Sequence, residues 1–342
     1  MIKKKESDDD NLYQQPINYP HPEIIRNLEV QNEVKASDPK VPANCRFRKS
    51  LKKVLLAINF NFIFYKLIPT LREFYTPHFR KVVFCGPEED VKYGHIIKMN
   101  SKRAGREGYH CLAKAIEFYH LKDGSDFDGY FYSNDDVMLN FWTLNEDTNK
   151  IWLGDTIVWR NAQDASKPLR KGSWWPANTP RCKRILNKLG NDSTANSYVQ
   201  NYYRNILRNF YNKTIAKDQL PVYDTKQERR ICVKSWSDAF YIPARYADGY
   251  VRLANMFEAE KLFLEIASPM IHNMLEDSTQ MLNMNGIYHV SKNFGFYGTY
   301  SFNSTFSHPF KLGDGTNMNF FKNVIVPYSQ HITNECKLEN GN

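Results

Sequence analysis

The sequence lacks the short motifs by which several common functional classes are recognised. It contains no glycine-rich phosphate loop of the usual kind, no zinc-finger spacing, no RNP-like strand and no basic helix followed by heptads. These absences exclude the familiar nucleic-acid-binding modules and give no support to a phosphate-loop nucleotide enzyme. None of the six cysteines stands in a CxxC pair, so a structural zinc site is not expected either.

Long apolar runs are also missing. The most apolar segment, 54–69, is short and is interrupted by Asn59, Asn61 and Lys66, so it does not suit a helix that crosses a bilayer. The first residues, MIKKKESDDD, have a basic start but lack the apolar core of a signal peptide. We therefore expect no transmembrane segment in this sequence, and neither a signal nor an anchor for secretion.

Two weaker features favour a secretory compartment. Asn-x-Ser/Thr sequons occur at Asn191, Asn212 and Asn303, and such sequons accept glycans only in that pathway. The even number of widely spaced cysteines permits disulfides without requiring them. A cytoplasmic location stays open at this point, because nothing in the sequence directs the chain to the lumen.

The charge balance is basic, with a net charge of +9. Lysines and arginines are scattered, and short clusters occur only at Lys3–Lys5, Arg46–Lys53 and Arg229–Arg230. A nucleic-acid binder usually shows a basic stripe within a recognisable module. We expect no nucleic-acid partner, because a small substrate that carries phosphate accounts for the same positive balance.

The chain of 342 residues, 42% of them hydrophobic, can build a sizeable core. Residues 1–49 are polar and contain prolines at 16, 20, 22, 39 and 42, which predicts a disordered leader. From about residue 50 the polar composition gives way to apolar runs. We predict one folded domain over 50–330, with halves at 50–145 and 146–330, followed by a tail at 331–342.

The first half of that domain alternates between strand and helix patterns. Short apolar runs at 54–60, 81–87 and 128–133 predict buried strands, and the segments 65–75 and 108–122 between them predict helices. This order is typical of an α/β fold with a mostly parallel sheet flanked by helices. Ligands of such sheets collect beyond the carboxyl ends of the strands.

An acidic cluster follows the third of these strands. The apolar run GYFYS leads directly into Asn134, Asp135 and Asp136, although burying charge is costly. Adjacent carboxylates at a strand end suit a hard divalent cation such as Mg²⁺ or Mn²⁺. The alternative is an ordinary solvated turn, in which Asn and Asp are common.

The segment YFYSNDDVML resembles the metal-binding DxD motif of GT-A fold glycosyltransferases, and Ser133–Val137 is most similar to the exostosin-type variant. The resemblance implies a GT-A-like, Rossmann-type sheet. It also implies that Asp136 ligates Mn²⁺ or Mg²⁺ on the diphosphate of a nucleotide sugar, with Asp135 beside it and Asn134 near the nucleotide. Asn134 departs from the acidic residue that commonly opens the motif.

Two later segments look similar to the rest of the family pattern. FLEIASP contains Glu265, which the resemblance implies to be a catalytic group near the acceptor, and HPFKLG contains His308, which it implies to be a third metal ligand. Lys311 is expected to meet a phosphate as a point charge. The alternatives are a solvated helical glutamate for Glu265 and an ordinary loop residue for His308.

Further candidates are less specific. Arg103 and Arg106 precede the helix predicted at 108 and are expected to contact the nucleotide, unless they belong to a solvated loop. WSDAFYIP contains Asp238, an alternative catalytic base, and Trp236, which suits either a sugar-binding site or core packing.

The reaction implied by the resemblance is the metal-dependent transfer of a sugar from a nucleotide-diphospho sugar, expected to be a UDP-sugar, to a glycan, glycoprotein or glycolipid. Residues 50–145 would bind the nucleotide and residues 146–330 the acceptor. The resemblance also implies the Golgi lumen as the location. Whether the reaction inverts or retains configuration stays open. Another metal-dependent nucleotide enzyme, such as a nucleotidyltransferase, and a non-catalytic member of the same fold that binds a glycan or a partner are the alternatives.

Overall fold

The computed structural model describes residues 45, 47–100, 104–144, 146–161, 175–192, 195–209, 231–288 and 300–338. All of them belong to one compact unit, Pro42–Asn342. Helices α2 (Phe47–Ser50) and α11 (Val326–Leu338) lie across the predicted domain limits. The division of the domain into two halves stays a prediction. No helix within the described ranges is long and apolar enough to span a membrane.

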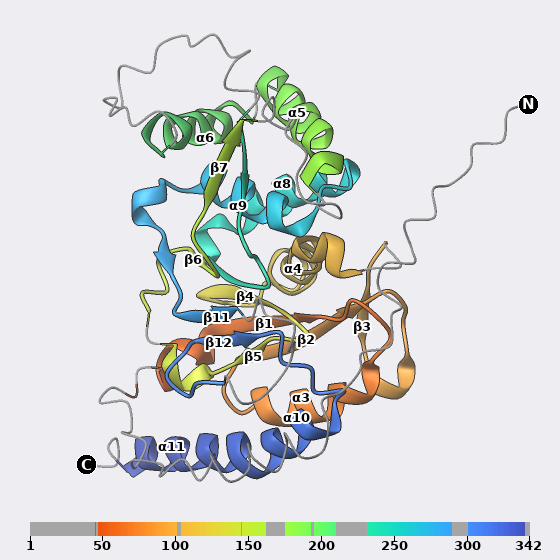
Figure 1. Cartoon of the computed structure of the whole chain (residues 1–342), viewed down its shortest axis with the longest axis vertical. Helices are drawn as coiled ribbons and strands as arrows, with labels where there is room; N and C mark the ends of the chain where they lie inside the picture. Colours follow the sequence, from red (N-terminus) through yellow and green to blue (C-terminus); the bar gives the residue numbers. More distant parts are fainter. Residues whose placement is uncertain are drawn as a thin grey trace, which may run out of the picture. The chain divides into compact units, whose positions relative to one another are not determined.

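The centre of the fold is a seven-stranded, mostly parallel sheet (Figure 1). Strand β9 pairs antiparallel with β4 and β6, whereas the other neighbours run parallel. The predicted α/β class with a mostly parallel sheet is therefore confirmed. The strands in spatial order are β10 (Leu282–Asn283), β6 (Trp152–Leu153), β9 (Ala239–Pro243), β4 (Gly129–Asn134), β1 (Val54–Asn59), β2 (Lys81–Gly86) and β3 (Ile96–Lys98).

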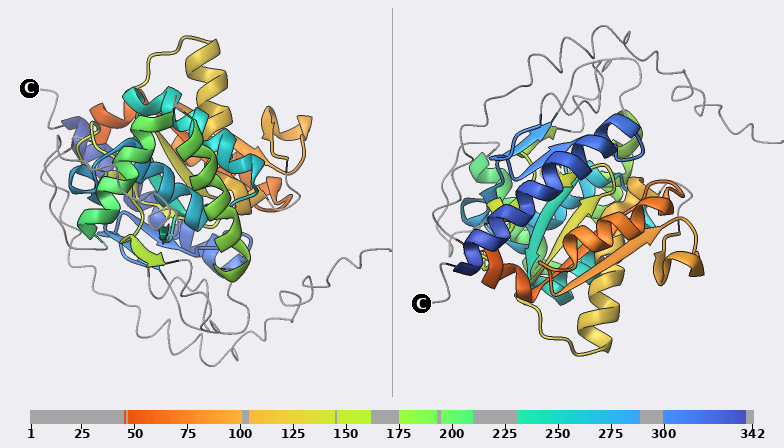
Figure 2. Two further views of the ribbon diagram at one scale, coloured as in Figure 1. Left: turned by 90° about the horizontal axis from the view of Figure 1, so that it is seen from above. Right: turned by 90° about the horizontal axis from the view of Figure 1, so that it is seen from below.

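Helices cover both faces of this sheet (Figures 1 and 2). One face carries α4 (Gly108–Ile116), α8 (Ala247–Ala259) and α9 (Leu264–Leu275), with α5 (Trp175–Asn191) and α6 (Asn196–Asn209) beyond them. The opposite face carries α3 (Ile68–Tyr75), α10 (Gly315–Phe320) and α11. Because both faces are covered, every residue of β1 is buried, which explains its continuous apolar sequence.

Two smaller sheets extend the fold. In the first, β12 (Phe306–His308) pairs with β11 (Gly286–Tyr288) and with β5 (Met138–Leu139). Since β5 follows the acidic cluster directly, this sheet brings His308 beside it. The second sheet joins β7 (Val158–Asn161) and β8 (Ile231–Lys234). Short 3₁₀ or π segments cover 51–53, 65–67, 91–93, 104–107, 117–122, 141–143, 244–246, 278–280 and 321–325.

All six cysteines form disulfides, namely Cys45–Cys336, Cys85–Cys111 and Cys182–Cys232. Cys85–Cys111 links the end of β2 to α4, and Cys182–Cys232 links α5 to β8. Cys45–Cys336 joins the start of the described chain to α11. Cys85–Cys111 thus ties a helix to the central sheet, and the other two disulfides fix α5 to β8 and α11 to the start of the described chain.

The sequence pattern predicts a helix over 258–275 with a kink or break at Pro269. The structure corrects the start of this helix and excludes the break: α9 begins at Leu264, and Pro269 lies inside it. Proline has no N–H to donate to the carbonyl four residues earlier, which here belongs to Glu265. That carbonyl instead accepts a hydrogen bond of 2.9 Å from the Ser235 N–H, so the proline helps to dock α9 against the segment before β9.

Candidate functional site

The acidic cluster forms a turn at the carboxyl end of β4, the central strand of the sheet. The Val137 N–H closes the turn on the Asn134 carbonyl at 3.2 Å, and the Asp135 N–H donates to Asn59 of β1 at 3.1 Å. The Phe310 N–H donates to the Asp136 carbonyl at 2.6 Å. The acidic cluster is thus a turn, as predicted, and it is held from β1 and from the segment after β12; the predicted metal site stays a prediction.

His308 lies between two carboxylates in this turn region. Its Nε2 is 3.3 Å from Asp136 Oδ1 and 3.5 Å from Asp238 Oδ1. The three side chains come from β12, the turn after β4 and the residue before β9. The structure thus brings Asp136, Asp238 and His308 together in one region.

A chain of hydrogen bonds fixes Asp238. The Tyr132 hydroxyl donates to Asn134 Oδ1 at 2.5 Å, and Asn134 Nδ2 donates to Asp238 Oδ1 at 2.6 Å. A backbone hydrogen bond joins the same two residues, since the Asn134 N–H donates to the Asp238 carbonyl at 2.9 Å. Asn134 thus uses its amide to orient a carboxylate, and its predicted contact with a nucleotide stays a prediction.

The two aspartates of the turn differ in their protonation. Burial and the neighbouring Asp136 charge raise the pKa of Asp135 to about 8, although the Asn61 N–H and Lys311 oppose the shift. Burial alone would also raise the pKa of Asp136, but the hydrogen bond and charge of His308, together with Lys311, bring it below its ordinary value. Near neutral pH, Asp136 is the ionised member of the pair.

The remaining groups respond to the same charges. Burial disfavours a charged imidazole, yet Asp238 and Asp136 raise the pKa of His308 to about 9. Burial raises the pKa of Asp238, with the His308 charge opposing it. Without a bound cation, a charged His308 therefore neutralises the cluster at neutral pH.

Glu265 lies in the first turn of α9 and is 9% exposed. Burial and the Asp238 charge raise the pKa of Glu265 to about 8, while Lys234 and His308 act in the opposite direction. A carboxyl whose pKa lies near neutral pH suits proton transfer. Because Glu265 is buried, the alternative of a solvated helical glutamate is wrong; its proposed catalytic role stays a prediction.

The predicted cationic residues have different positions. Lys311 is exposed and its charge acts on both Asp135 and Asp136. Arg106 is exposed on the 3₁₀ segment Ala104–Glu107 that leads into α4. Arg103 lies outside the described residues. The roles proposed for both arginines stay predictions.

The donor set suits a hard cation, but its present arrangement is an ion pair. Within the described ranges, no three His, Cys, Asp or Glu side chains are spaced as ligands of a metal. Asp238 Oδ2 is buried and accepts no hydrogen bond from the residues that the structure describes. A buried carboxylate oxygen without a donor costs free energy of folding. Carboxylate oxygens with one imidazole are ligands that Mn²⁺ accepts, so the donor types suit such a cation although their present spacing does not.

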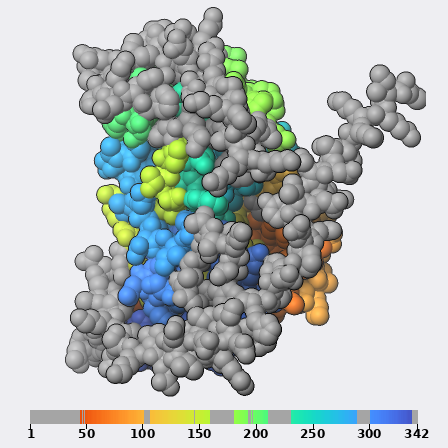
Figure 3. Space-filling view, viewed as in Figure 1, coloured from red at the N-terminus to blue at the C-terminus, as the bar shows by residue number. Residues whose placement is uncertain are grey.

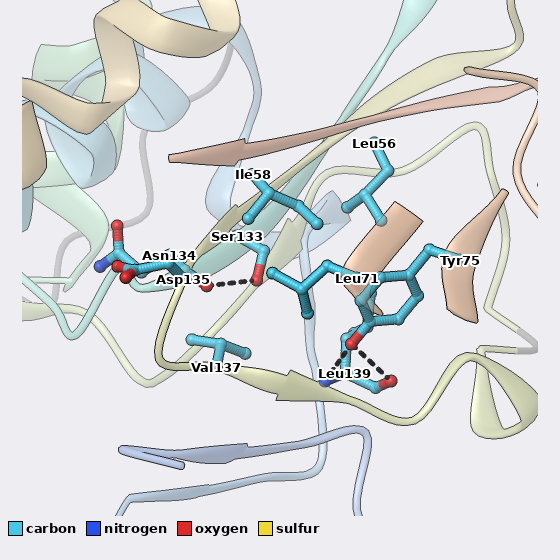
Figure 4. Close-up of a pocket in the computed structure, with 9 residues that line it drawn as sticks. All are labelled: Leu56, Ile58, Leu71, Tyr75, Ser133, Asn134, Asp135, Val137 and Leu139. Atoms are coloured by element: carbon cyan, nitrogen blue, oxygen red, sulfur yellow. Dashed lines mark hydrogen bonds between the residues drawn. The ribbon is translucent and has the colours of Figure 1, made fainter. Parts of the chain in front are cut away.

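Beneath the turn lies a small hollow lined by Asp135, Asn134, Ser133 and apolar side chains of β1, α3 and β5 (Figure 4). The lining side chains leave no space in it even for a water molecule. The hollow is therefore not the binding site of a nucleotide.

Sequence reasoning missed two tyrosines of the site. Tyr132 lies inside the buried strand β4, where an aromatic residue is read as core, and Tyr288 packs its ring 5.6 Å from that of His308. The alternation of β4 carried a usable signal: Tyr132 and Asn134 are two residues apart, so their side chains share one face of the strand.

Comparison with known proteins gives distant similarity. The chain is 24% identical over 205 residues to the probable glycosyltransferase STELLO2 of Arabidopsis thaliana, a match that covers 55% of this chain and 24% of that protein. It is 23% identical over 233 residues to the probable glycosyltransferase STELLO1 of the same plant, covering 66% of this chain and 25% of that protein. The chain thus spans about a quarter of the length of these curated relatives. No family model matches the sequence.

Proposed function

We propose that this protein is a metal-dependent glycosyltransferase that moves a sugar from a nucleotide-diphospho sugar, a UDP-sugar, to a glycan, glycoprotein or glycolipid. The observation that carries the proposal is the convergence of Asp136, Asp238 and His308 at the carboxyl end of the central strand. The two distant relatives named probable glycosyltransferases support glycosyl transfer in general. The mostly parallel sheet is compatible with a Rossmann-like glycosyltransferase fold.

Asp135, Asp136 and His308 would hold the cation, Mn²⁺ or Mg²⁺. The cation would neutralise charge that develops on the diphosphate leaving group. Lys311 adds a fixed positive charge whose effect already reaches both aspartates. The carboxyl ends of β1 and β2 lie beside this turn and would bind the nucleotide.

In the transfer, the bond between the anomeric carbon and the diphosphate oxygen breaks, and a bond from that carbon to the acceptor oxygen forms. The proton of the acceptor hydroxyl has to leave. Glu265 and Asp238 are buried carboxyls outside the set proposed to hold the cation, and both have a raised pKa. In an inverting reaction one of them accepts the proton; in a retaining reaction it orients the acceptor or stabilises positive charge at the anomeric carbon.

We propose the lumen of the secretory pathway, and the Golgi in particular, as the location. Disulfides persist in oxidising compartments, and three of them support this proposal. The sequon asparagines Asn191 and Asn303 are exposed, whereas Asn212 lies outside the described residues.

The test is isothermal titration of the protein with UDP in the presence and absence of Mn²⁺, together with Asp136→Ala. We expect UDP binding that requires Mn²⁺ and that Asp136→Ala abolishes. Asp123→Ala, which removes an exposed carboxylate elsewhere, should bind as the parent does. Binding of UDP and of GDP that ignores both Mn²⁺ and Asp136 would overturn the proposed site. The product formed from a UDP-sugar then separates glycosyl transfer from nucleotidyl transfer.

A further inference from the structure

Trp236 keeps a large apolar ring in water close to the buried carboxylates. It is 41% exposed, whereas its neighbours Ser235, Ser237 and Asp238 are each less than a tenth exposed. A single exposed aromatic side chain is ordinary. The way in which this one is supported is what points to a ligand.

The indole is held by an aromatic stack that ends at the site. Its ring lies 5.5 Å from that of Tyr288, with an angle of 30° between the planes. Tyr288 in turn packs 5.6 Å from His308 and 5.2 Å from Phe306. One ring therefore separates Trp236 from the histidine that contacts Asp136 and Asp238.

The backbone around Trp236 is fixed as well. The Ser235 hydroxyl donates to the Asp155 carbonyl at 2.9 Å, and the Ser235 N–H donates to Glu265. A side chain at Gly154 would start 2.5 Å from the Ala239 carbonyl and 2.8 Å from the Tyr288 hydroxyl, so this close approach needs glycine. The ring is thus presented from a rigid base and loses little freedom when a ligand binds.

The sheet topology places Trp236 away from the proposed nucleotide side. β4 has β1 and β2 on one flank and β9 on the other, and Trp236 precedes β9. In the space-filling view the colours of residues 150–160, 231–240 and 280–288 meet on one face (Figure 3), as the contacts of Trp236 and Ser235 also require. The exposed face of Trp236 therefore lies on the β9 side of the candidate site, opposite β1.

Carboxyl residues lie near Trp236 in the fold. Ser235, directly before it, donates to the carbonyls of Asp155 and Glu265, and Asp238 follows two residues later; Asp155 is half-buried, whereas Asp238 and Glu265 are buried. A pyranose ring has one face of C–H groups, which packs on an aromatic plane, and a rim of hydroxyls, which need hydrogen-bond acceptors. The combination of an exposed, braced indole with carboxyl residues nearby in the fold matches that chemistry.

We propose that Trp236, braced by Tyr288, is the platform on which the acceptor binds, and that the acceptor presents a pyranose ring there. This inference rests on the proposed function for its direction, since it assigns the sugar at Trp236 to the acceptor and the β1 side to the nucleotide. It makes the acceptor class a carbohydrate and not a bare peptide hydroxyl or a lipid alcohol.

The test uses fluorescently labelled full-length protein on an array of immobilised mono- and oligosaccharides, with Mn²⁺ and UDP present. We expect the parent to bind one or more pyranose-containing glycans, Trp236→Ala to bind them about tenfold more weakly or worse, and Trp236→Phe to recover part of the loss. Phe118→Ala removes an exposed aromatic ring of similar exposure elsewhere, 46%, and should change nothing. UDP–Mn²⁺ titration of the same variants should give unchanged affinity.

Other outcomes separate this inference from the proposed function. Glycan binding that Trp236→Ala leaves intact, or a parent that binds no glycan on the array, overturns the platform. Loss of UDP affinity in Trp236→Ala overturns its assignment to the acceptor. Glycan binding that depends on Trp236 in a protein that does not bind UDP would keep the platform and overturn the proposed transferase.

Discussion

Asn134 differs from an acidic residue in one way that matters at this site: its amide can donate. Nδ2 donates to Asp238 while Oδ1 accepts from Tyr132, so the side chain connects a buried hydroxyl to a buried carboxylate. A carboxylate at this position would face Asp238 without a proton between them. The unusual first residue of the motif therefore belongs to the way Asp238 is oriented.

Replacing Asn134 by aspartate tests this role. Asn134→Asp should destabilise the fold by about 1 to 3 kcal/mol at pH 8, where two facing carboxylates compete for one proton, and by less at pH 5, where a shared proton restores the bond. The measurement is urea unfolding at both pH values. Asn149→Asp is the matched control, because Asn149 donates to Asp147 in an exposed pair; equal pH dependence in the two variants would contradict the role.

Because His308 has a raised pKa, we expect metal binding to release protons. Its pKa of about 9 and that of Asp135, about 8, leave both groups mostly protonated at pH 7 in the metal-free protein, whereas metal ligands must lose their protons. Mn²⁺ affinity should therefore rise from pH 6 to pH 9. Titration at pH 7 in buffers of different ionisation enthalpy measures the protons released. His308→Gln should release fewer, and a buffer-independent enthalpy for the parent would contradict the assignment.

The raised pKa of Glu265 predicts that the folded protein loses stability as pH rises. Its pKa is about 8 in the folded protein against 4.5 as the ordinary value, so the folded state holds the proton more tightly and loses stability as pH rises from about 4.5 towards 8. Glu265→Gln should be more stable than the parent at pH 8 and equal to it at pH 4.5. Thermal unfolding at the two pH values checks this. A variant that is less stable at pH 8 would show that ionised Glu265 is well paired.

The residues predict one part of this site by themselves. The apolar strand that ends in NDD predicts an acidic cluster at the carboxyl edge of the sheet, whereas His308 and Glu265 come from the family resemblance; the structure brings His308 and Asp238 to this cluster. The role of Tyr132 was not readable, because a tyrosine within a buried strand looks like core until its partner is known. The docking of α9 through the Glu265 carbonyl depends on a tertiary hydrogen bond from Ser235, which no local pattern records.

At the scale of elements, the approach of α4 to β4 depends on Gly108 at the first position of the helix. A Cβ there would lie 1.8 Å from the Tyr132 hydroxyl and 2.7 Å from its Cζ. The helix can therefore come close to the sheet only at a residue without a side chain. The same contact holds the tyrosine hydroxyl against Asn134.

Gly108→Ala should push the Tyr132 ring out of place, break its hydrogen bond to Asn134 and destabilise the fold by about 1 to 3 kcal/mol. Gly313→Ala is the control, since nothing lies within 4 Å of a Cβ there, and it should stay within about 0.5 kcal/mol of the parent. Denaturant unfolding measures both. Equal stability of the two variants would mean that the tyrosine moves aside freely and that the close approach is not required.

At the scale of the whole molecule, Cys45–Cys336 closes almost the entire described chain, with a sequence separation of 291 residues. Replacing both cysteines by serine should cost about 3 to 5 kcal/mol in unfolding free energy, because long loops restrict the unfolded chain most. Mn²⁺-dependent UDP binding should survive, since none of the hydrogen bonds of the acidic turn involves these residues. Thermal unfolding and the UDP titration check the two halves of this prediction; a variant of unchanged stability would contradict the first.

The pairing of the cysteines also determines when each disulfide can form during synthesis of the chain. Cys85 and Cys182 each pair with the next cysteine to follow along the chain, whereas Cys45 is made first and its partner last. At about 5 to 20 residues per second, 291 residues take roughly 15 to 60 s, during which four other thiols emerge. A ribosome therefore delivers the wrong partners for Cys45 before the right one, and correct maturation calls for a catalyst that exchanges disulfides or for a delay in oxidation until α11 has docked.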